Sequence, residues 1–278
     1  MQDTKQIVEA GGARIPLLGL GTWELRGNVC VRAVEQALRL GYRHVDTAEL
    51  YDNEAAVGEG LRASGISRGE VFVTTKIWPA HFAPGDLQRA ARACLTRLKL
   101  SAVDLLLLHW PNPQIPIAET LAALARVKRE GLTRHIGISN FTVAQLEQAV
   151  RASSEPLVCD QIECHPFLDQ TKVIAACRRH GMAVVAYSPL ARGNAVADKV
   201  LGRIGAAHGK TAAQVSLRYL VQQHIVVIPR TAKVERLKEN AAIFDFVLSN
   251  KEMAEIAALA HRRGRVVHWA YSGTQKWD

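Results

Sequence analysis

Eight short apolar runs alternate with longer stretches of helical periodicity along this 278-residue chain, and this alternation constrains the fold most strongly. The runs are rich in β-branched residues or leucine and are almost continuously apolar, as expected of parallel strands covered on both faces. Strands and helices in alternation build α/β folds, and eight repeats in a chain of this length predict a closed (β/α)8 TIM barrel. We expect one domain over residues 1–278, because no linker or change of composition divides the chain.

The expected elements follow from these patterns. Strands are predicted at 17–23, 43–48, 71–76, 103–109, 134–139, 158–163, 183–188 and 225–229. Helices are predicted at 28–41, 86–100, 118–131, 142–153, 170–181, 211–223 and 250–263, and glycine ends three of them. Ahead of the first strand, two apolar segments joined by Gly11-Gly12 predict an N-terminal β-hairpin. We expect a loop and one helix in the long interval 190–224, and an irregular aromatic tail over 264–278.

The charge balance narrows the class of ligand. A net charge of +9 favours an anionic ligand, because a basic cleft concentrates negative substrates. Nucleic acid is the competing partner, but the basic residues are scattered and form no recognised binding module, so we expect no nucleic-acid binding. No apolar run reaches the roughly 18 residues of a membrane span, and the N-terminus lacks the apolar stretch of a signal peptide. We therefore expect a cytoplasmic protein without a membrane partner, and a monomer because nothing demands an oligomer.

The five cysteines are odd in number and have no C-x-x-C spacing, which favours a reducing compartment. Cys159, Cys164 and His165 are close in sequence, so a metal site has to be considered. Residues of opposite parity on a strand face opposite sides, so Cys164 should point away from His165. We expect buried structural thiols and no bound metal, and the roles of Glu163 and His165 stay open.

Unusual polar residues lie at the carboxyl end of nearly every expected strand. In strand order they are Gly21-Thr22-Trp23, Asp46, Lys76, His109, Ser139-Asn140, Gln161, Tyr187-Ser188 and Pro229-Arg230-Thr231, and Tyr51 follows Asp46 by one short loop. In a barrel of parallel strands, this rim is where active sites are built. A single polar residue at a strand end is common, but a complete ring predicts an enzyme active site.

Asp46, Tyr51, Lys76 and His109 have complementary chemistry. A free tyrosine, with a pKa of about 10, is a weak acid at neutral pH, and an ammonium within about 4–6 Å favours the phenolate and lowers that pKa. A carboxylate beside the lysine keeps the ammonium charged, while a histidine can orient a carbonyl group. Tyr51 is therefore the expected general acid, protonating an oxygen on which negative charge develops. Reduction of a carbonyl also needs a cofactor, because no side chain supplies a hydride.

In these residues the chain resembles the aldo-keto reductases. The matching stretches are LGLGTW, GYRHVDTAELYDNEAAVG, TTKIW, LLLLHWP, GISNF, QIECHP, AYSPL and IPRTAKVERLKEN, in order from residue 18 to 240. The second stretch, together with Lys76 and the HWP triplet, is the specific part of the match. Within the family, the chain is similar to the bacterial branch that contains 2,5-diketo-gluconate reductases.

The resemblance implies a role for each rim residue. Tyr51 would be the proton donor, Asp46 and Lys76 would tune it, and His109 would position the carbonyl. NADP(H) would lie extended across the barrel mouth, in agreement with the absence of a G-x-G-x-x-G motif. The implied cofactor contacts are Ser139, Asn140 and Gln161 at the carboxamide, Tyr187 stacked on the nicotinamide, Ser188 and Leu190 at the pyrophosphate, Arg230, Thr231 and Arg236 at the 2′-phosphate, and Glu239 and Asn240 at the adenine. Gly21, Thr22, Trp23 and Pro229 complete the expected cofactor site.

Two features of the sequence bear on specificity. Arg230 stands where the family most often has lysine, and its bidentate fork suits a phosphate. With Arg236 nearby, we expect NADP(H) rather than NAD(H). The second feature is the tail 264–278, which matches no family pattern securely although it lies where family members select substrates.

Aromatic residues are expected to wall the substrate pocket. Trp23, Trp78 and Trp110 each follow a strand end and would form apolar walls. In the C-terminal substrate loop, Trp269, Tyr271 and Trp277 either complete a lid or pack the tail onto the barrel. The short segment after the fourth strand predicts an open mouth, suited to small polar or anionic carbonyls such as α-dicarbonyls and keto-sugar acids, and to aromatic aldehydes.

Other interpretations remain at this point. A non-catalytic family member could bind NADPH and report redox state, although an intact Tyr51–Lys76 pair argues against it. An unrelated metal-dependent barrel hydrolase would need a ligand set such as H-x-H after the first strand, which the sequence lacks. Asp46 could instead cap the next helix. Asn53 and Glu54 are expected to be structural at the start of a helix, and Asp104 to lie at the opposite, stability-bearing face.

Overall fold

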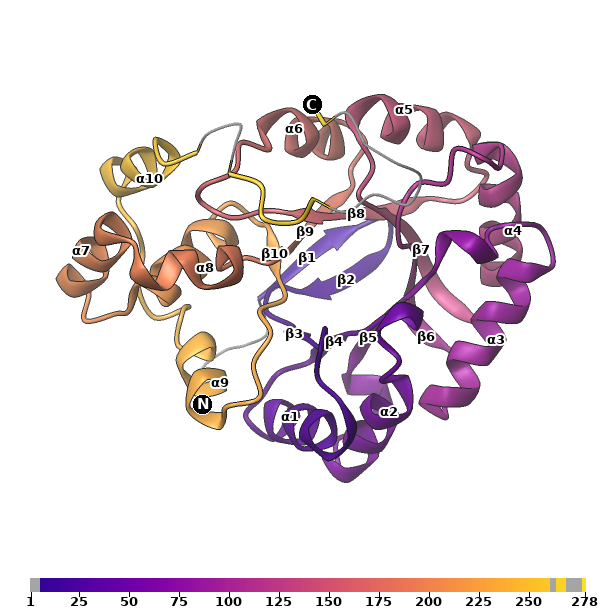
Figure 1. The fold of residues 1–278 in the computed structure, drawn as a ribbon, viewed down its shortest axis with the longest axis horizontal. Coiled ribbons are helices and arrows are strands. Elements are labelled where there is room, and N and C mark those ends of the chain that lie inside the picture. Colours follow the sequence, from indigo (N-terminus) through magenta and orange to yellow (C-terminus); the bar gives the residue numbers. More distant parts are fainter. Residues whose placement is uncertain (1–5, 261–263, 269–276) are drawn as a thin grey trace.

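Eight parallel strands form the centre of the computed structural model, which describes residues 6–260, 264–268 and 277–278 (Figure 1). In sheet order they are β10 (Val226–Val227), β9 (Ala183–Tyr187), β8 (Leu157–Glu163), β7 (Thr133–Ser139), β6 (Val103–Leu108), β5 (Phe72–Ile77), β4 (His44–Asp46) and β3 (Leu20–Gly21). Parallel bridges from Leu18 to Val227 and from Gly21 to Arg230 join the two ends of this order. The predicted barrel is therefore confirmed.

The N-terminal hairpin is also confirmed. Strands β1 (Ile7–Ala10) and β2 (Ala13–Pro16) are antiparallel, and Gly11 and Gly12 form the turn with φ of 53° and 83°. Positive φ at both central residues is the geometry that two-residue hairpins favour. A Cβ atom at Gly11 would lie 2.9 Å from Val158 at the start of β8, so the hairpin packs at the amino end of the barrel. The opposite end is left for the rim residues.

Ten α-helices surround the strands in the described part of the chain (Figure 1). They are α1 (Gly27–Arg39), α2 (Glu54–Ala63), α3 (Asp86–Leu98), α4 (Ile117–Arg129), α5 (Val143–Ala152), α6 (Thr171–Arg179), α7 (Lys199–Ala207), α8 (Ala212–Val221), α9 (Val234–Ala241) and α10 (Asn250–Ala257). The apolar stripe of α3 is buried against the sheet, as its helical spacing predicts. Gly41, Gly131 and Gly181 follow α1, α4 and α6 with φ of 100°, 74° and 64°, the left-handed conformation that ends helices.

Three expectations about element bounds were wrong. The interval 190–224 holds two helices, α7 and α8, and the 3₁₀ segment η4 (Ala191–Ala197), rather than one helix. Gly202 and Gly205 lower the helical propensity of α7 and conceal it in the sequence. The outer strands β3 and β10 are only two residues long, and Pro229 lacks the amide hydrogen needed to extend β10. Helix α10 ends at Ala257, while 261–263 lie outside the described residues.

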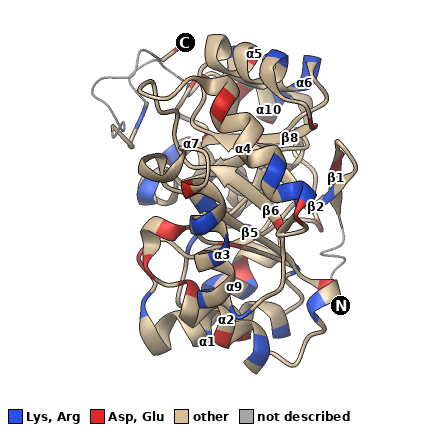
Figure 2. Ribbon diagram, turned by 90° about the vertical axis from the view of Figure 1, so that its right-hand side faces the viewer, with Lys and Arg blue, Asp and Glu red and all other residues tan. Residues whose placement is uncertain are grey.

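Charged residues are distributed without a basic face on the side shown in Figure 2, where lysine and arginine alternate with acidic residues along the helices. All five cysteines are free and buried, as predicted. Asp104, near the start of β6, accepts hydrogen bonds from Arg68 and Arg134, which agrees with a stabilising role away from the rim. Within the described residues, no helix has the length and apolarity needed to cross a membrane.

Candidate active site

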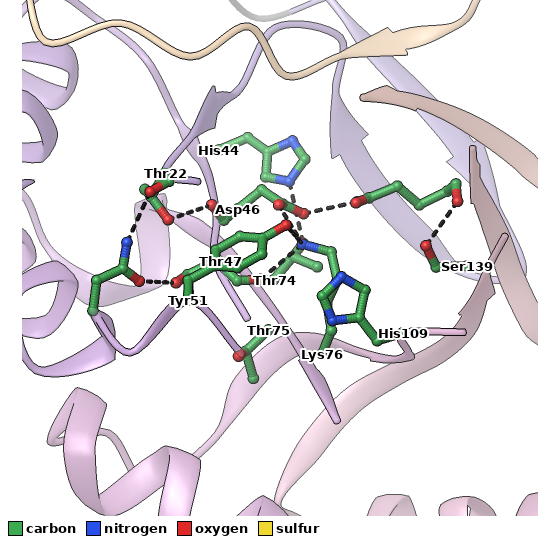
Figure 3. A network of polar contacts seen from close by, with 12 residues as sticks. Thr22, His44, Asp46, Thr47, Tyr51, Thr74, Thr75, Lys76, His109 and Ser139 are labelled. Carbon is green, nitrogen blue, oxygen red and sulfur yellow. Dashed lines mark hydrogen bonds and ion pairs between the residues drawn. The ribbon is translucent and has the colours of Figure 1, made fainter. Parts of the chain in front are cut away.

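Three strand ends and one short turn bring the expected acid and its partners together (Figure 3). Asp46 is the last residue of β4, Lys76 is the last but one of β5, and His109 directly follows β6. Tyr51 ends the 3₁₀ turn η1 (Glu49–Tyr51), which leads from β4 to α2. Asp52 after it has a φ of 51°, so the chain reverses immediately behind the tyrosine. Parallel strands place their carboxyl ends at one edge, and this edge carries the four side chains.

The ammonium of Lys76 is fully buried and donates three hydrogen bonds. Its Nζ atom lies 2.5 Å from Oδ1 of Asp46, 2.8 Å from the Thr47 carbonyl oxygen and 3.3 Å from the Tyr51 hydroxyl oxygen. These acceptors use all three N–H bonds of the ammonium. The Tyr51 oxygen therefore accepts from Lys76, and its own proton is left for another acceptor.

Asp46 is held from both sides of the barrel. Its Oδ2 atom accepts a hydrogen bond of 2.7 Å from Nε2 of Gln161, on β8 across the barrel. Its backbone oxygen accepts from the Thr22 hydroxyl at 2.9 Å. Because the carboxylate is engaged with Lys76 and Gln161, the interpretation of Asp46 as a helix cap is not supported.

The pKa values of Tyr51, Lys76 and His109 are shifted by burial and by neighbouring charges. Burial raises the pKa of Tyr51, and Lys76 opposes this shift without reversing it, so the expected net lowering by Lys76 was wrong. For Lys76, burial lowers the pKa, but Asp46 and Tyr51 outweigh burial and the net pKa is raised. Burial and the Lys76 charge hold the pKa of His109 well below 6.5. At neutral pH the site thus contains a protonated tyrosine, a charged lysine and a neutral histidine.

Aromatic rings pack around Tyr51 and His109 on the rim. Trp23 meets the Tyr51 ring edge to face at 4.8 Å, and Trp78 meets the His109 ring at 5.4 Å. Trp23 is 42 % exposed, whereas Trp110 is buried and packs against Trp277 at 6.1 Å. Trp23 thus contacts the acid directly, Trp78 packs on the neighbouring His109, and Trp110 supports the tail. Trp269 lies outside the described residues.

A second polar cluster continues from His109 toward β9. Asn140 donates from Nδ2 to the His109 carbonyl oxygen at 3.0 Å and accepts from the Tyr187 hydroxyl at 2.7 Å. Ser139 donates to the Gln161 carbonyl oxygen at 2.8 Å. Because Asn140 also donates to the Ser139 hydroxyl at 3.1 Å, the four residues expected at the nicotinamide lie in one connected network beside the acid.

The remaining expected cofactor residues lie along the neighbouring part of the rim. Ser188 and Leu190 follow β9 at the start of η4, and the Gly21–Arg230 bridge brings the end of β10 beside the end of β3. Pro229 and Thr231 are buried, and Arg236 is exposed on α9. Asn240 is buried, and Glu239 accepts a hydrogen bond from Thr211 at 2.5 Å.

Several contacts at the rim were not anticipated from the sequence. Asn53 donates to the Thr22 and Leu25 carbonyl oxygens and accepts from Thr47, so it ties two rim loops together and does not cap α2 through its side chain. Glu24 forms an ion pair of 2.8 Å with Arg230. The position of Asn53, two residues after Tyr51, could have indicated its role at the rim. The contact of Glu24 could not have been predicted, because its partner Arg230 lies 206 residues away in sequence.

Glu163 and His165, left open by the sequence, lie side by side and buried, with Nε2 of His165 3.0 Å from Oε1 of Glu163. Cys164 is buried separately in the apolar core. No group of three or more potential ligands among histidine, cysteine and acidic residues is present in the part of the chain that is described.

Comparisons with known proteins agree with this geometry. The model of the Aldo/keto reductase family matches residues 17–261. Methylglyoxal reductase DkgB of Escherichia coli O157:H7 is 42 % identical over 248 residues, covering 88 % of this chain and 93 % of the relative. Glyoxal reductase of Bacillus subtilis is 39 % identical over 261 residues, with 93 % of each chain covered. A crystal structure assigned as 2,5-diketo-D-gluconic acid reductase B superposes with a TM-score of 0.95 at 48 % identity, over 100 % of this chain and 98 % of that one.

The fold and rim define a barrel oxidoreductase, and the chain belongs to the aldo-keto reductase family. The resemblance predicted from the motifs is confirmed, including the similarity to bacterial 2,5-diketo-gluconate reductases. Family membership also overturns the interpretation as an unrelated metal-dependent hydrolase.

Proposed function

We propose that this protein reduces small polar carbonyl compounds to alcohols with NADPH, with Tyr51 as the general acid. The observation that carries the proposal is the hydrogen-bond arrangement of Lys76, whose three acceptors leave the Tyr51 proton free for a substrate oxygen. The relatives described as methylglyoxal and glyoxal reductases support α-dicarbonyls as one substrate class. Keto-sugar acids and aromatic aldehydes are the others that we propose.

The residues along the rim suit an extended phosphate-bearing cofactor. Arg230 and Arg236 are exposed. Arg236 forms no ion pair with a described residue, and the pair of Arg230 with Glu24 is open to solvent, so a 2′-phosphate can reach both guanidinium groups. Tyr187 is only partly buried and its hydroxyl is held by Asn140, which fixes its ring as a stacking surface. We therefore propose NADP(H) over NAD(H), held by the rim residues from Ser139 to Asn240.

The chain's own residues account for the proton transfer. NADPH bound at this rim would supply the hydride that the polypeptide lacks. His109, neutral and next to Tyr51, would orient the carbonyl oxygen toward the Tyr51 hydroxyl. Tyr51 then donates its proton to the oxygen as charge develops there, and the adjacent Lys76 ammonium stabilises the resulting phenolate. Asp46 keeps Lys76 charged and in place throughout.

The shape and chemistry of the mouth support small substrates. Only residues 109–116 separate β6 from α4, so this loop is short, and Trp23 is 42 % exposed beside Tyr51. An open mouth with two tryptophan walls accommodates a small dicarbonyl or an aromatic aldehyde. The five buried free thiols support a reducing, cytoplasmic location. We propose that the protein acts as a single-domain monomer.

The proposal is tested by following NADPH oxidation with methylglyoxal or phenylglyoxal for the wild type and Tyr51→Phe. We expect kcat/KM to fall by about a thousandfold or more in the variant, while the Kd for NADPH stays within about twofold. NADH measured in parallel tests the cofactor preference.

Equal activity of both proteins would remove Tyr51 from the mechanism. If both bound NADPH tightly yet reduced none of the three proposed carbonyl classes, the non-catalytic redox-sensor interpretation would replace the proposed function.

A further inference from the structure

Glu163 is a buried carboxylate at the barrel mouth that the proton transfer does not use. It is the last residue of β8, on the same face of the strand as Gln161, and it pairs in register with Tyr187 of β9. A fully buried carboxylate is costly unless several donors satisfy it. Its partners therefore indicate what it holds.

The C-terminal segment supplies most of these partners. The backbone N–H of Val266 donates to Oε1 of Glu163 at 2.6 Å, and that of Val267 donates to Oε2 at 3.0 Å. The guanidinium of Arg265, whose side chain is only 9 % exposed, lies 3.5 Å from Oε2. Together with His165, three successive tail residues surround one carboxylate that lies 103 positions before Val266 in the chain. Charge-assisted bonds of this kind are stronger than neutral ones.

Two further contacts fix the same junction from the barrel side. Nδ1 of His165 accepts from the Phe167 N–H at 3.3 Å, so the ring proton resides on Nε2 and is donated to Glu163. Gly264 lies directly against the Phe167 carbonyl oxygen, and a Cβ atom at this position would collide with that oxygen. The tail can approach the barrel this closely only through a glycine.

The described end of the tail extends this junction to the active site. The Arg265 guanidinium stacks on the Trp277 ring at 3.6 Å, and Trp277 meets Trp110, the neighbour of His109. Asp278 accepts a hydrogen bond of 2.8 Å from the Val143 N–H at the start of α5. Figure 1 shows residues 264–268, in yellow, running beside β8 and β9. The tail thus contacts the rim next to both His109 and Tyr187.

We propose that Glu163 is a positioning residue that holds residues 265–267 against the barrel mouth and thereby sets the affinity for the carbonyl substrate. It does not touch the reacting atoms, and its effect passes through the tail. The kinetic part of this inference rests on the proposed carbonyl reduction, whereas the structural part does not.

The test compares wild type, Glu163→Gln, Arg265→Met and the double variant. In Glu163→Gln an amide NH₂ replaces one acceptor and faces the backbone donors of the tail, so the junction should open. We expect KM for methylglyoxal to rise about tenfold while kcat and the Kd for NADPH change less than about threefold. The rise in KM of the double variant should match that of either single variant rather than the product of the two, because both changes break the same junction.

Hydrogen exchange of a peptide covering 264–268 gives a readout that is independent of activity. We expect protection to be lost in Glu163→Gln and retained in the matched control Glu155→Gln, whose carboxylate pairs with Lys128 away from the tail. Glu163→Asp keeps the charge and should restore part of the protection.

Unchanged exchange in Glu163→Gln would refute the anchoring role, and so would a loss of kcat with KM unchanged. If Glu163→Gln does not fold, Arg265→Met tests the junction from the tail side by the same measurements. A wild type that reduces no carbonyl would contradict the proposed function, while the exchange data would still decide whether Glu163 anchors the tail.

Discussion

The pKa of Tyr51 depends on a balance between burial of its side chain and the charge of Lys76. Burial favours the neutral phenol, and the ammonium 3.3 Å away favours the phenolate. In the free protein burial has the larger effect, so the hydroxyl stays protonated at neutral pH and is available as an acid. Lys76 becomes more important once the proton has left, because it then pairs with a full negative charge.

This balance predicts the pH dependence of carbonyl reduction. Activity requires protonated Tyr51, whose pKa burial raises above the ordinary tyrosine value, so the rate should fall only in the alkaline range as pH approaches that pKa. The pKa of His109 lies well below 6.5, so His109 stays neutral and adds no change of rate at neutral or alkaline pH. We expect kcat/KM for reduction to be flat from neutral pH into the alkaline range, measured with a stable buffer series at constant ionic strength. A decline centred near pH 8 would mean that Lys76 outweighs burial.

At the residue scale, the sequence predicted which side chains meet but not their energetic balance. Asp46, Lys76 and His109 were predictable because each ends a recognisable apolar strand. The sign of the net pKa shift of Tyr51 was not predictable, because it depends on how deeply the assembled rim buries the ring. The bond from Gln161 to Asp46 crosses the barrel between residues 115 apart, and local patterns do not contain such contacts.

At the element scale, the loop after β3 and the end of β10 are linked by the ion pair of Glu24 with Arg230. Both side chains are about half exposed, so the pair is screened by solvent and is worth at most about 1 kcal/mol. Under the proposed cofactor site, Glu24 competes with the 2′-phosphate for the same guanidinium. This competition would weaken binding of NADPH but not of NADH.

We therefore expect Glu24→Gln to lower the Kd for NADPH by about two- to fivefold and to leave the Kd for NADH unchanged. Fluorescence titration of each cofactor at fixed ionic strength measures both values. Arg230→Met should weaken NADPH binding. In a protein that carries Arg230→Met, adding Glu24→Gln should no longer change the Kd for NADPH. Equal effects of Glu24→Gln on both cofactors would place the competition elsewhere than at the 2′-phosphate.

The elements themselves were predicted best where periodicity is long and uninterrupted. The apolar stripe of α3 and the apolar run of β6 indicate directly which residues are buried. The predicted bounds of both elements differ from the observed ones by at most two residues. Helix α7 was missed because Gly202 and Gly205 interrupt its helical signal, although tertiary packing of its apolar face stabilises it. The bounds of β3 and β10 depend on how the barrel closes, which no single segment determines.

For the whole molecule, closure of the barrel depends on a narrow seam between its first and last strands. Two isolated bridges, Leu18 to Val227 and Gly21 to Arg230, replace the longer ladders found between the central strands. Gly21 allows this approach, because a Cβ atom there would lie 2.5 Å from the Ile228 carbonyl oxygen. The bridge from Gly21 to Arg230 also places Arg230 at the rim. Closure of the barrel and the proposed phosphate site therefore depend on the same contact.

Gly21→Ala tests this dependence. The added methyl group would push β3 away from Ile228, and overpacking of this kind destabilises a protein by about 1–3 kcal/mol. The Kd for NADPH should rise as well, because Arg230 shifts with the seam. Gly202→Ala is the matched control, since its Cβ position on α7 is open and alanine favours a helix by about 0.5–1 kcal/mol. Urea unfolding should therefore give opposite signs for the two variants, and a neutral Gly21→Ala would mean that the seam can widen freely.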